Sequence, residues 1–315
     1  MTLASTFWRR SFALPPGERR VFQVAEDSQI VGYCHWQPGP RTDRPMVAIV
    51  HGLEGSSDSG YVMGIAENAF AAGFHALRLN QRNCGGTERL TPTLYNSGLS
   101  GDYRAVLREL TEVDGLTAVF FIGYSMGGNL VLKMAGELGA AAPAELRGVC
   151  GVCPALDLAA CAGALERPDN FIYEWHFVRN LLARYARKAE LFPERYPRDG
   201  FGPIRTLKEF DDKITAPHSG YRDAADYYAR ASARNVVGEI RVPTLLVTAQ
   251  NDPFVLFSSF RIAGVEENPA IVFEAPEHGG HCAFISRHAG AARFWAERRV
   301  VDFCREIAAR AAAPA

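Results

Sequence analysis

The sequence predicts an α/β protein: a mostly parallel central sheet with helices on both faces and an inserted helical cap. Strand-like and helix-like spacings of apolar residues alternate along most of the 315 residues, a pattern that builds a parallel sheet covered by helices. The alternation stops over residues 158–236, which are mostly helical in pattern, and then resumes. The chain is 48% hydrophobic and 22% charged, as expected for a globular protein with a large core.

The N-terminal half contains most of the expected sheet. Residues 20–25 and 29–36 predict a hairpin whose turn is Glu26-Asp27-Ser28. Short buried strands are then expected at 46–50, 75–79, 118–123 and 146–153. Amphipathic spacing predicts helices between and after them, at 61–72, 99–109 and 126–138.

The C-terminal half begins with the insertion. Within it, apolar residues recur at steps of four and three, which predicts one apolar helix face: Phe171, Trp175, Val178, Leu182 and Tyr185. Of these, Phe171, Trp175 and Val178 are expected either to line an acyl pocket or to pack the cap onto the sheet. Strands are expected again at 244–249 and 271–275, before a final helix from about 291 to 310. The expected organisation is therefore a core of residues 1–157 and 237–315 with a cap of residues 158–236.

Charge and cysteine content exclude several classes of function. The 34 basic and 35 acidic residues give a formal charge of −1, without the basic excess typical of nucleic-acid binding. No run of 18 uncharged apolar residues predicts a transmembrane helix, and the N-terminal residues lack the apolar region of a secretory signal. Seven scattered cysteines, an odd number, predict reduced thiols and a cytoplasmic location.

No metal or cofactor motif stands out. Cys150 and Cys153 form a C-x-x-C pair, but they lie in the apolar run 148–154 without a second Cys or His pair, which indicates a buried strand end. The sequence contains no zinc-protease motif, EF-hand loop or phosphate-binding loop, and Gly127-Gly128-Asn129 is not a dinucleotide fingerprint. We therefore expect neither a metal nor an organic cofactor.

The motif Gly123-Tyr124-Ser125-Met126-Gly127 carries the main prediction of chemistry. It directly follows an expected strand and precedes an expected helix, the context that a nucleophile elbow requires. Side chains in place of the glycines would clash in so tight a turn. The helix N-terminus also places partial positive charge where an oxyanion would form. Ser125 is therefore the candidate nucleophile.

A nucleophilic serine needs a base and a residue that orients the base. In this architecture the acid and then the histidine follow the serine along the chain. Asp252 follows the expected strand 244–249, and His281 follows the expected strand 271–275. Asp157 competes with Asp252, and His278 competes with His281. Pro253 beside Asp252 and the flexible Gly279-Gly280 before His281 favour the later residue in each case.

An oxyanion hole requires two backbone N–H donors. Met126, immediately after the candidate nucleophile, is expected to supply the first. The second is expected from the loop His51-Gly52-Leu53-Glu54-Gly55, which follows the strand 46–50. Leu53 is the preferred donor, with Glu54 as the alternative.

Five segments carry a resemblance to a known family: HGLEGSSDSGY (51–61), LNQRNCGGTERLTPTLYNSG (79–98), GYSMGGN (123–129), NDPF (251–254) and HGGHCAF (278–284). They resemble the YheT-like branch of the α/β-hydrolase superfamily, which is similar to eukaryotic abhydrolase-domain lipid esterases and yeast medium-chain ester synthases. The resemblance implies an α/β-hydrolase fold, the roles given above to Ser125, Asp252, His281 and Leu53, and action on carboxylic esters of short or medium acyl chains without a metal or organic cofactor. Residues 82–86 match a family segment as well, and a structural role is expected for them.

These observations predict a serine esterase that acts on a small-molecule ester, lipid-derived esters included. An acyltransferase with the same triad is the alternative, and a non-catalytic binder with this fold is a third reading. The spacing of His218 and Asp223 matches an H-x4-D acyltransferase pattern, but these residues fall in the expected cap and not after a sheet strand. They are therefore not expected to be catalytic.

Overall fold

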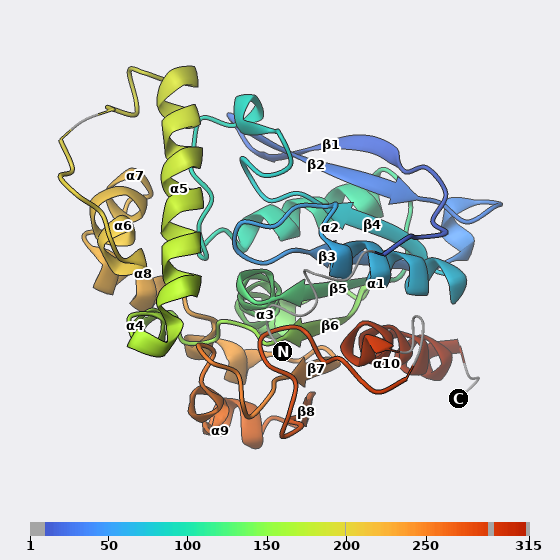
Figure 1. The fold of residues 1–315 in the computed structure, drawn as a ribbon. Coiled ribbons are helices and arrows are strands. Elements are labelled where there is room, and N and C mark those ends of the chain that lie inside the picture. Colours follow the sequence, from blue (N-terminus) through green and yellow to red (C-terminus); the bar gives the residue numbers. More distant parts are fainter. Residues whose placement is uncertain (1–9, 199, 289–292, 313–315) are drawn as a thin grey trace.

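An eight-stranded sheet forms the centre of the computed structural model, which describes residues 10–198, 200–288 and 293–312 (Figure 1). The strands lie in the order β1-β2-β4-β3-β5-β6-β7-β8. Their bounds are β1 Glu18–Ala25, β2 Ser28–His35, β3 Met46–Val50, β4 His75–Leu79, β5 Val119–Tyr124, β6 Leu146–Val152, β7 Thr244–Val247 and β8 Ile271–Glu274. The expected α/β class with a mostly parallel sheet is confirmed.

The antiparallel part of the sheet lies at the edge formed by the first two strands, β1 and β2. β1 pairs with β2, and β2 pairs with β4, in antiparallel register, whereas the pairs from β4 to β8 are parallel. The expected hairpin is present, but Ser28 belongs to β2 and pairs with Ala25. The turn therefore consists of Glu26 and Asp27 alone.

Helices cover both faces of the sheet, as expected. α1 (Gly60–Ala71) and α10 (Trp295–Ala312) pack on one face, and α2 (Gly101–Glu112) and α3 (Met126–Leu138) pack on the other. Alternate residues of β5 point to the two faces, so Phe120 and Phe121 belong to different core clusters. The expected start of the last helix near residue 291 lies outside the described residues.

Residues 158–236 lie between β6 and β7 in the chain and form a separate group of helices. They are α4 (Leu158–Leu165), α5 (Phe171–Leu191), α6 (Leu207–Phe210), α7 (Ala216–His218) and α8 (Ala224–Ala231). Figure 1 shows these helices together at the left, away from the helices that cover the sheet. A short helix, α9 (Ala263–Glu266), lies between β7 and β8.

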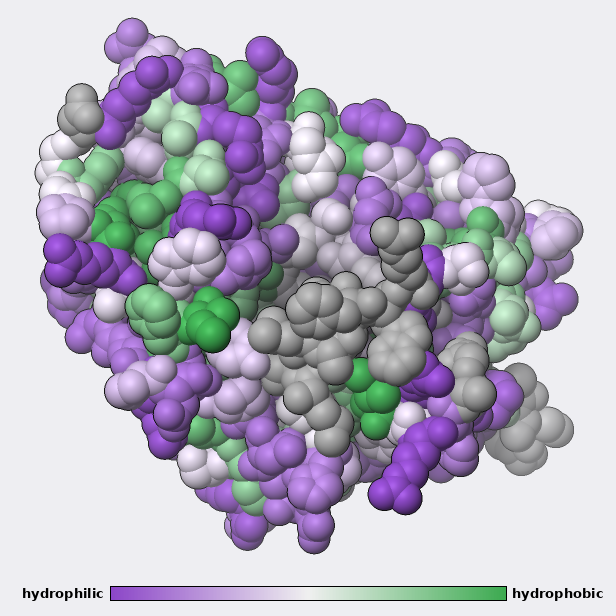
Figure 2. All heavy atoms as spheres, in the orientation of Figure 1, coloured by the Kyte–Doolittle hydropathy of each residue, from purple (hydrophilic) through white to green (hydrophobic). Residues whose placement is uncertain are grey.

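The apolar face expected on α5 is partly wrong. Phe171 and Trp175 are 66% and 50% exposed, and the neighbouring Ile172 is 65% exposed. The buried stripe is turned by one residue at the start of the helix, because Glu174 points inward and accepts the Leu207 N–H at 3.1 Å. The N-terminal end of α5 therefore presents hydrophobic side chains to solvent, and Figure 2 shows hydrophobic surface, in green, over this end of the helix.

No helix in the described part of the chain is both long enough and apolar enough to cross a bilayer.

Candidate active site

The turn between β5 and α3 holds Ser125 in a conformation that few L-residues adopt. Its backbone has φ 52° and ψ −118°. A Cβ on Gly123 would lie 2.1 Å from the Gly127 carbonyl oxygen, and a Cβ on Gly127 would lie 2.4 Å from the Val50 and His51 carbonyl oxygens. Both positions therefore require glycine. A backbone held in so unusual a region is typical of functional sites, where the surrounding structure offsets the strain.

Ser125, His281 and Asp252 form a continuous chain of hydrogen bonds. The Ser125 Oγ lies 3.0 Å from the His281 Nε2, and the His281 Nδ1 lies 2.8 Å from the Asp252 Oδ2. Asp252 follows β7 and His281 follows β8, so the sheet brings together side chains that are far apart in sequence. The other carboxylate oxygen of Asp252 accepts the N–H groups of Phe254 at 3.1 Å and Val255 at 2.9 Å, which fixes its orientation.

The electrostatic environment of these three side chains favours an ionised Asp252 and a strongly basic His281. Burial by itself raises the pKa of Asp252, but attraction to His281 and the two backbone N–H donors outweigh burial and lower it. Burial by itself lowers the pKa of His281, but the Asp252 carboxylate outweighs burial and raises it. A histidine that takes the proton of a serine hydroxyl becomes an imidazolium, and a neighbouring carboxylate stabilises that cation.

The two competing residues lie elsewhere. His278 is exposed, and its ring is 3.5 Å from the Asn251 side-chain amide. Asp157 caps the start of α4 by accepting the Ala160 N–H at 3.0 Å. The structure thus brings Ser125, Asp252 and His281 together but not His278 or Asp157.

The H-x4-D pair in the helical insertion has two separate structural environments. The His218 ring packs against Tyr196, with ring centroids 4.8 Å apart. Asp223 caps α8 by accepting the Asp226 N–H at 2.8 Å. His218 and Asp223 therefore each have a structural contact of their own, and these contacts do not support a joint catalytic role.

The expected oxyanion donors border the same cavity as the serine. Leu53, Ser125 and Met126 all line it. Met126 is the first residue of α3, where backbone N–H groups have no partner within the helix. The Glu54 N–H instead lies 3.4 Å from the Tyr95 hydroxyl, which favours Leu53 over Glu54 as the second donor.

The cavity beside Ser125 has a mainly apolar lining. α4 and α5 contribute much of that lining, including Leu158, Phe177 and Leu181. The expectation that Phe171, Trp175 and Val178 line an acyl pocket is wrong, because Phe171 and Trp175 face solvent and Val178 is not among the lining residues. The rotation of α5 described above accounts for the difference.

A polar group also borders the cavity, and sequence reasoning missed it. Burial raises the pKa of the Asp211 carboxyl to about 6, with hydrogen bonds to Thr215 and Tyr228 opposing the shift. The Tyr228 hydroxyl donates to this carboxyl at 2.8 Å. No local sequence pattern distinguishes Asp211 from the many solvated acidic residues around it.

A buried ion pair joins the loop that contains Leu53 to α5 and was likewise not expected. The Arg184 guanidinium donates to both carboxylate oxygens of Glu54, at 2.9 and 3.2 Å, and also to the Asn83 carbonyl. The Tyr95 hydroxyl donates to the same carboxylate. Glu54 has a positive φ of 59°, so Arg184 and Tyr95 hold a residue in a strained conformation next to Leu53.

Comparisons with known proteins found a matching family model and several relatives. Residues 45–287 match the family model described as "alpha/beta hydrolase fold". The putative esterase YheT of Escherichia coli is 31% identical over 96% of this chain and 88% of that protein. Mouse phospholipase ABHD3 is 27% identical over 77% of this chain, and the match covers 59% of that protein. The yeast medium-chain fatty acid ethyl ester synthase/esterase 2 is 27% identical over 83% of this chain and 62% of that protein.

Solved structures show the same fold. The Pyrococcus furiosus esterase Pf2001 superposes with a TM-score of 0.62 at 15% identity, and the match covers 92% of each chain. The family match and the curated relatives confirm the resemblance drawn from the sequence motifs.

Proposed function

The chain belongs to the α/β-hydrolase family, and from that premise we propose that it is a serine esterase acting through an acyl-enzyme on Ser125. The observation that carries the proposal is the hydrogen-bonded chain Ser125–His281–Asp252 at the wall of an apolar cavity. The relatives' names, esterase and phospholipase, support ester hydrolysis.

The first half of the reaction forms the acyl-enzyme. The Ser125 hydroxyl donates to the His281 Nε2, which takes the proton as the Oγ attacks the ester carbonyl. Asp252 accepts the Nδ1–H and stabilises the imidazolium that results. The tetrahedral oxyanion accepts hydrogen bonds from the N–H groups of Leu53 and Met126, which border the cavity beside the nucleophile. The alcohol then leaves with the proton from His281.

The second half releases the acid. A water molecule gives a proton to the His281 Nε2 and attacks the acyl carbonyl, and the same two N–H groups stabilise the second tetrahedral intermediate. Collapse of that intermediate returns the proton to Ser125. No other group has to change its protonation state for one turnover.

The cavity indicates the class of ester. A mainly apolar lining beside the nucleophile suits an acyl chain, and we infer short or medium acyl chains, including those of lipid-derived esters. We propose that residues 158–236 act as the cap of a core formed by 1–157 and 237–315, because α4 and α5 line the cavity opposite the sheet. A cytoplasmic location remains a prediction from the odd number of cysteines.

Acyl transfer to an alcohol is the second candidate. The similarity to the yeast ester synthase/esterase favours it, since the same triad can deliver the acyl group to an alcohol in place of water. Assays in added ethanol separate the two reactions: ester formation that outpaces acid release would establish the transferase.

The test of the proposed function is covalent labelling. Wild type treated with a fluorophosphonate is expected to gain the mass of one adduct, and Ser125→Ala is expected to gain none. Cleavage of an acyl-chain series by the labelled and unlabelled protein would then define the substrate. Absence of an adduct on folded wild type would contradict the proposal and favour a non-catalytic binder.

A further inference from the structure

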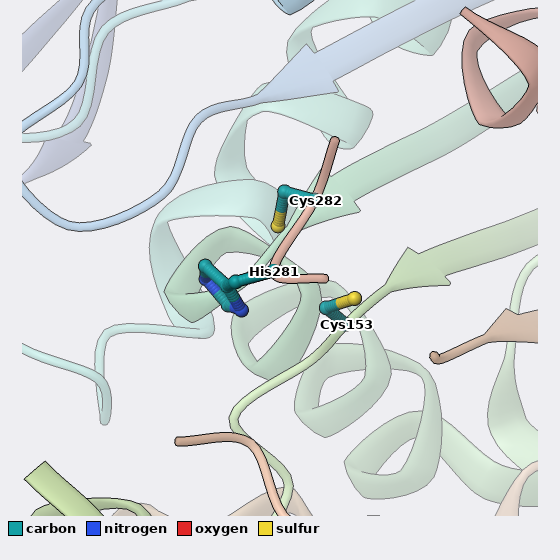
Figure 3. Close-up of side chains that lie close together, drawn as sticks. All are labelled: Cys153, His281 and Cys282. Carbon is teal, nitrogen blue, oxygen red and sulfur yellow. The ribbon is translucent and has the colours of Figure 1, made fainter. Parts of the chain in front are cut away.

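Two thiols lie close to the imidazole of His281, which is part of the candidate triad. Cys153 directly follows β6, and His281 and Cys282 lie on the loop after β8; Figure 3 shows the three side chains next to one another. One ligand atom from each, the two Sγ atoms and a ring nitrogen, lie within 4.8 Å of one another. Cys150, the other half of the C-x-x-C pair, instead directs its thiol to the Val300 carbonyl at 3.9 Å and is not part of this cluster.

The backbone holds both thiols in place. Cys153 and Cys282 have positive φ values of 41° and 62°, which non-glycine residues rarely adopt. The Cys153 thiol lies 3.8 Å from the Gly280 carbonyl, and the Cys282 thiol lies 4.0 Å from the Val152 carbonyl. Each thiol therefore points to the segment that carries the other, so the two segments are already side by side.

This donor set suits a thiophilic divalent cation. Two sulfurs and one imidazole nitrogen are ligands that Zn²⁺ commonly takes. In a tetrahedral site, with Zn–S bonds of about 2.3 Å and Zn–N bonds of about 2.0 Å, the ligand atoms lie about 3.5 to 3.8 Å apart. Since the observed separations are at most 4.8 Å, these atoms would have to approach one another by about 1.3 Å at most.

The local charge supports the same conclusion. The Asp252 carboxylate, 2.8 Å from the His281 ring, supplies negative charge next to the cluster.

We propose that Cys153, His281 and Cys282 form a site for Zn²⁺ or a similar thiophilic divalent cation, and that its occupation inhibits the enzyme. Binding forms two metal–sulfur bonds and one metal–nitrogen bond, and each thiol releases its proton to solvent. The His281 Nδ1 is hydrogen-bonded to Asp252 and the Nε2 to Ser125. Metal coordination through either nitrogen therefore breaks one of these two hydrogen bonds. The inhibition rests on the proposed function, whereas the binding does not.

The binding test uses Co²⁺, because thiolate ligation to Co²⁺ gives a charge-transfer absorption that other ligands do not. Anaerobic titration of wild type is expected to show this absorption with one Co²⁺ per chain. Cys153→Ser and Cys282→Ser are each expected to weaken Co²⁺ affinity at least tenfold. Cys34→Ser, which changes a buried cysteine of β2 outside the cluster, should bind as wild type does. Ser125→Ala keeps all three ligands and should bind Co²⁺ whether or not the protein is an esterase.

Inhibition is measured separately with Zn²⁺. Wild-type ester cleavage should fall with added Zn²⁺ and return when EDTA is added, while both cysteine variants should resist the same Zn²⁺ concentration. No thiolate absorption in wild type overturns the site, even when the cysteine variants do not fold. Equal Zn²⁺ inhibition of wild type and variants assigns the effect elsewhere and overturns it too. Failure of the proposed function appears differently, as wild type without Zn²⁺ that takes up no fluorophosphonate.

Discussion

Replacing Arg184 by Met should impair catalysis although this residue is not part of the triad. The Arg184 and Glu54 side chains are only 10% and 9% exposed, so the variant leaves the Glu54 carboxylate buried without its cationic partner. Removing one partner of a buried ion pair costs about 3 to 5 kcal/mol in the free energy of unfolding. The folded protein can relieve that cost by turning Glu54 toward solvent, which would shift the adjoining Leu53 N–H.

The effect on rate follows from the role proposed for that N–H. Loss of one oxyanion donor lowers kcat by about 10²- to 10³-fold, and a displaced donor retains part of its effect. We therefore expect kcat of Arg184→Met to fall by about 10- to 100-fold, with KM changed much less, since a donor to the oxyanion acts mainly in the transition state. Steady-state assays with a chromogenic short-chain ester would separate the two constants, and denaturant unfolding would give the stability.

Two further variants make the reasoning refutable. Combining Arg184→Met with Glu54→Gln removes the unpaired charge, so the double variant should be more stable than Arg184→Met alone by at least about 1 kcal/mol. Arg187→Met, on the same helix, removes an arginine that is 51% exposed, and kcat should stay within a factor of two of wild type. A folded Arg184→Met with wild-type kcat would refute the argument, as would a double variant no more stable than the single one.

Three other predictions follow from the site and the fold. Asp252→Asn should lower kcat by about 10⁴-fold in the same ester assay, because the imidazole loses the carboxylate that orients it and stabilises its cation; a loss below tenfold would place the acid elsewhere. His281 must be neutral to accept a proton, and its pKa is raised above the ordinary value of 6.5, so kcat/KM should fall as pH decreases through a midpoint above 6.5. A pH profile with that midpoint at or below 6.5 would contradict the ion pair with Asp252. Gly127→Ala should destabilise the fold by at least about 1 to 3 kcal/mol in denaturant unfolding, because its Cβ would meet two carbonyl oxygens at 2.4 Å. Gly163→Ala is the matched control, because Gly163 lies in α4 and its Cβ would meet nothing within 4 Å. This variant should be more stable than wild type by no more than about 1 kcal/mol.

The sheet and the candidate triad were accessible from sequence because their signals are local. Each strand from β3 to β8 is a short, mostly apolar segment. Ser125 directly follows β5, and Asp252 and His281 lie in the loops after β7 and β8. Parallel strands end at the same edge of a sheet, so residues in the loops after these strands are expected to lie close together.

The contacts that sequence reasoning missed depend on rotations and long-range packing. The periodicity of α5 is ambiguous by one residue, and only its contacts with the α6 segment, such as Glu174 with Leu207, decide which side is buried. The Arg184–Glu54 pair joins residues 130 positions apart, for which a single sequence gives no pairing signal. Cys282 stood beside His281 in the chain, but its approach to Cys153 required knowledge of how β6 and the last loop meet.

The order of the site residues along the chain has a consequence for biosynthesis. Ser125 is made 156 residues before His281. At about 5 to 20 residues per second, translation takes about 8 to 30 s to cover that distance. Under the proposed mechanism, the nascent chain carries the nucleophile without its base during this interval, and β7 and β8, which precede the acid and the base in the chain, are made only toward its end. On that proposal, catalytic competence is among the last properties the protein acquires, and a chain that stops short of β8 should be inert toward esters even if its N-terminal half has folded.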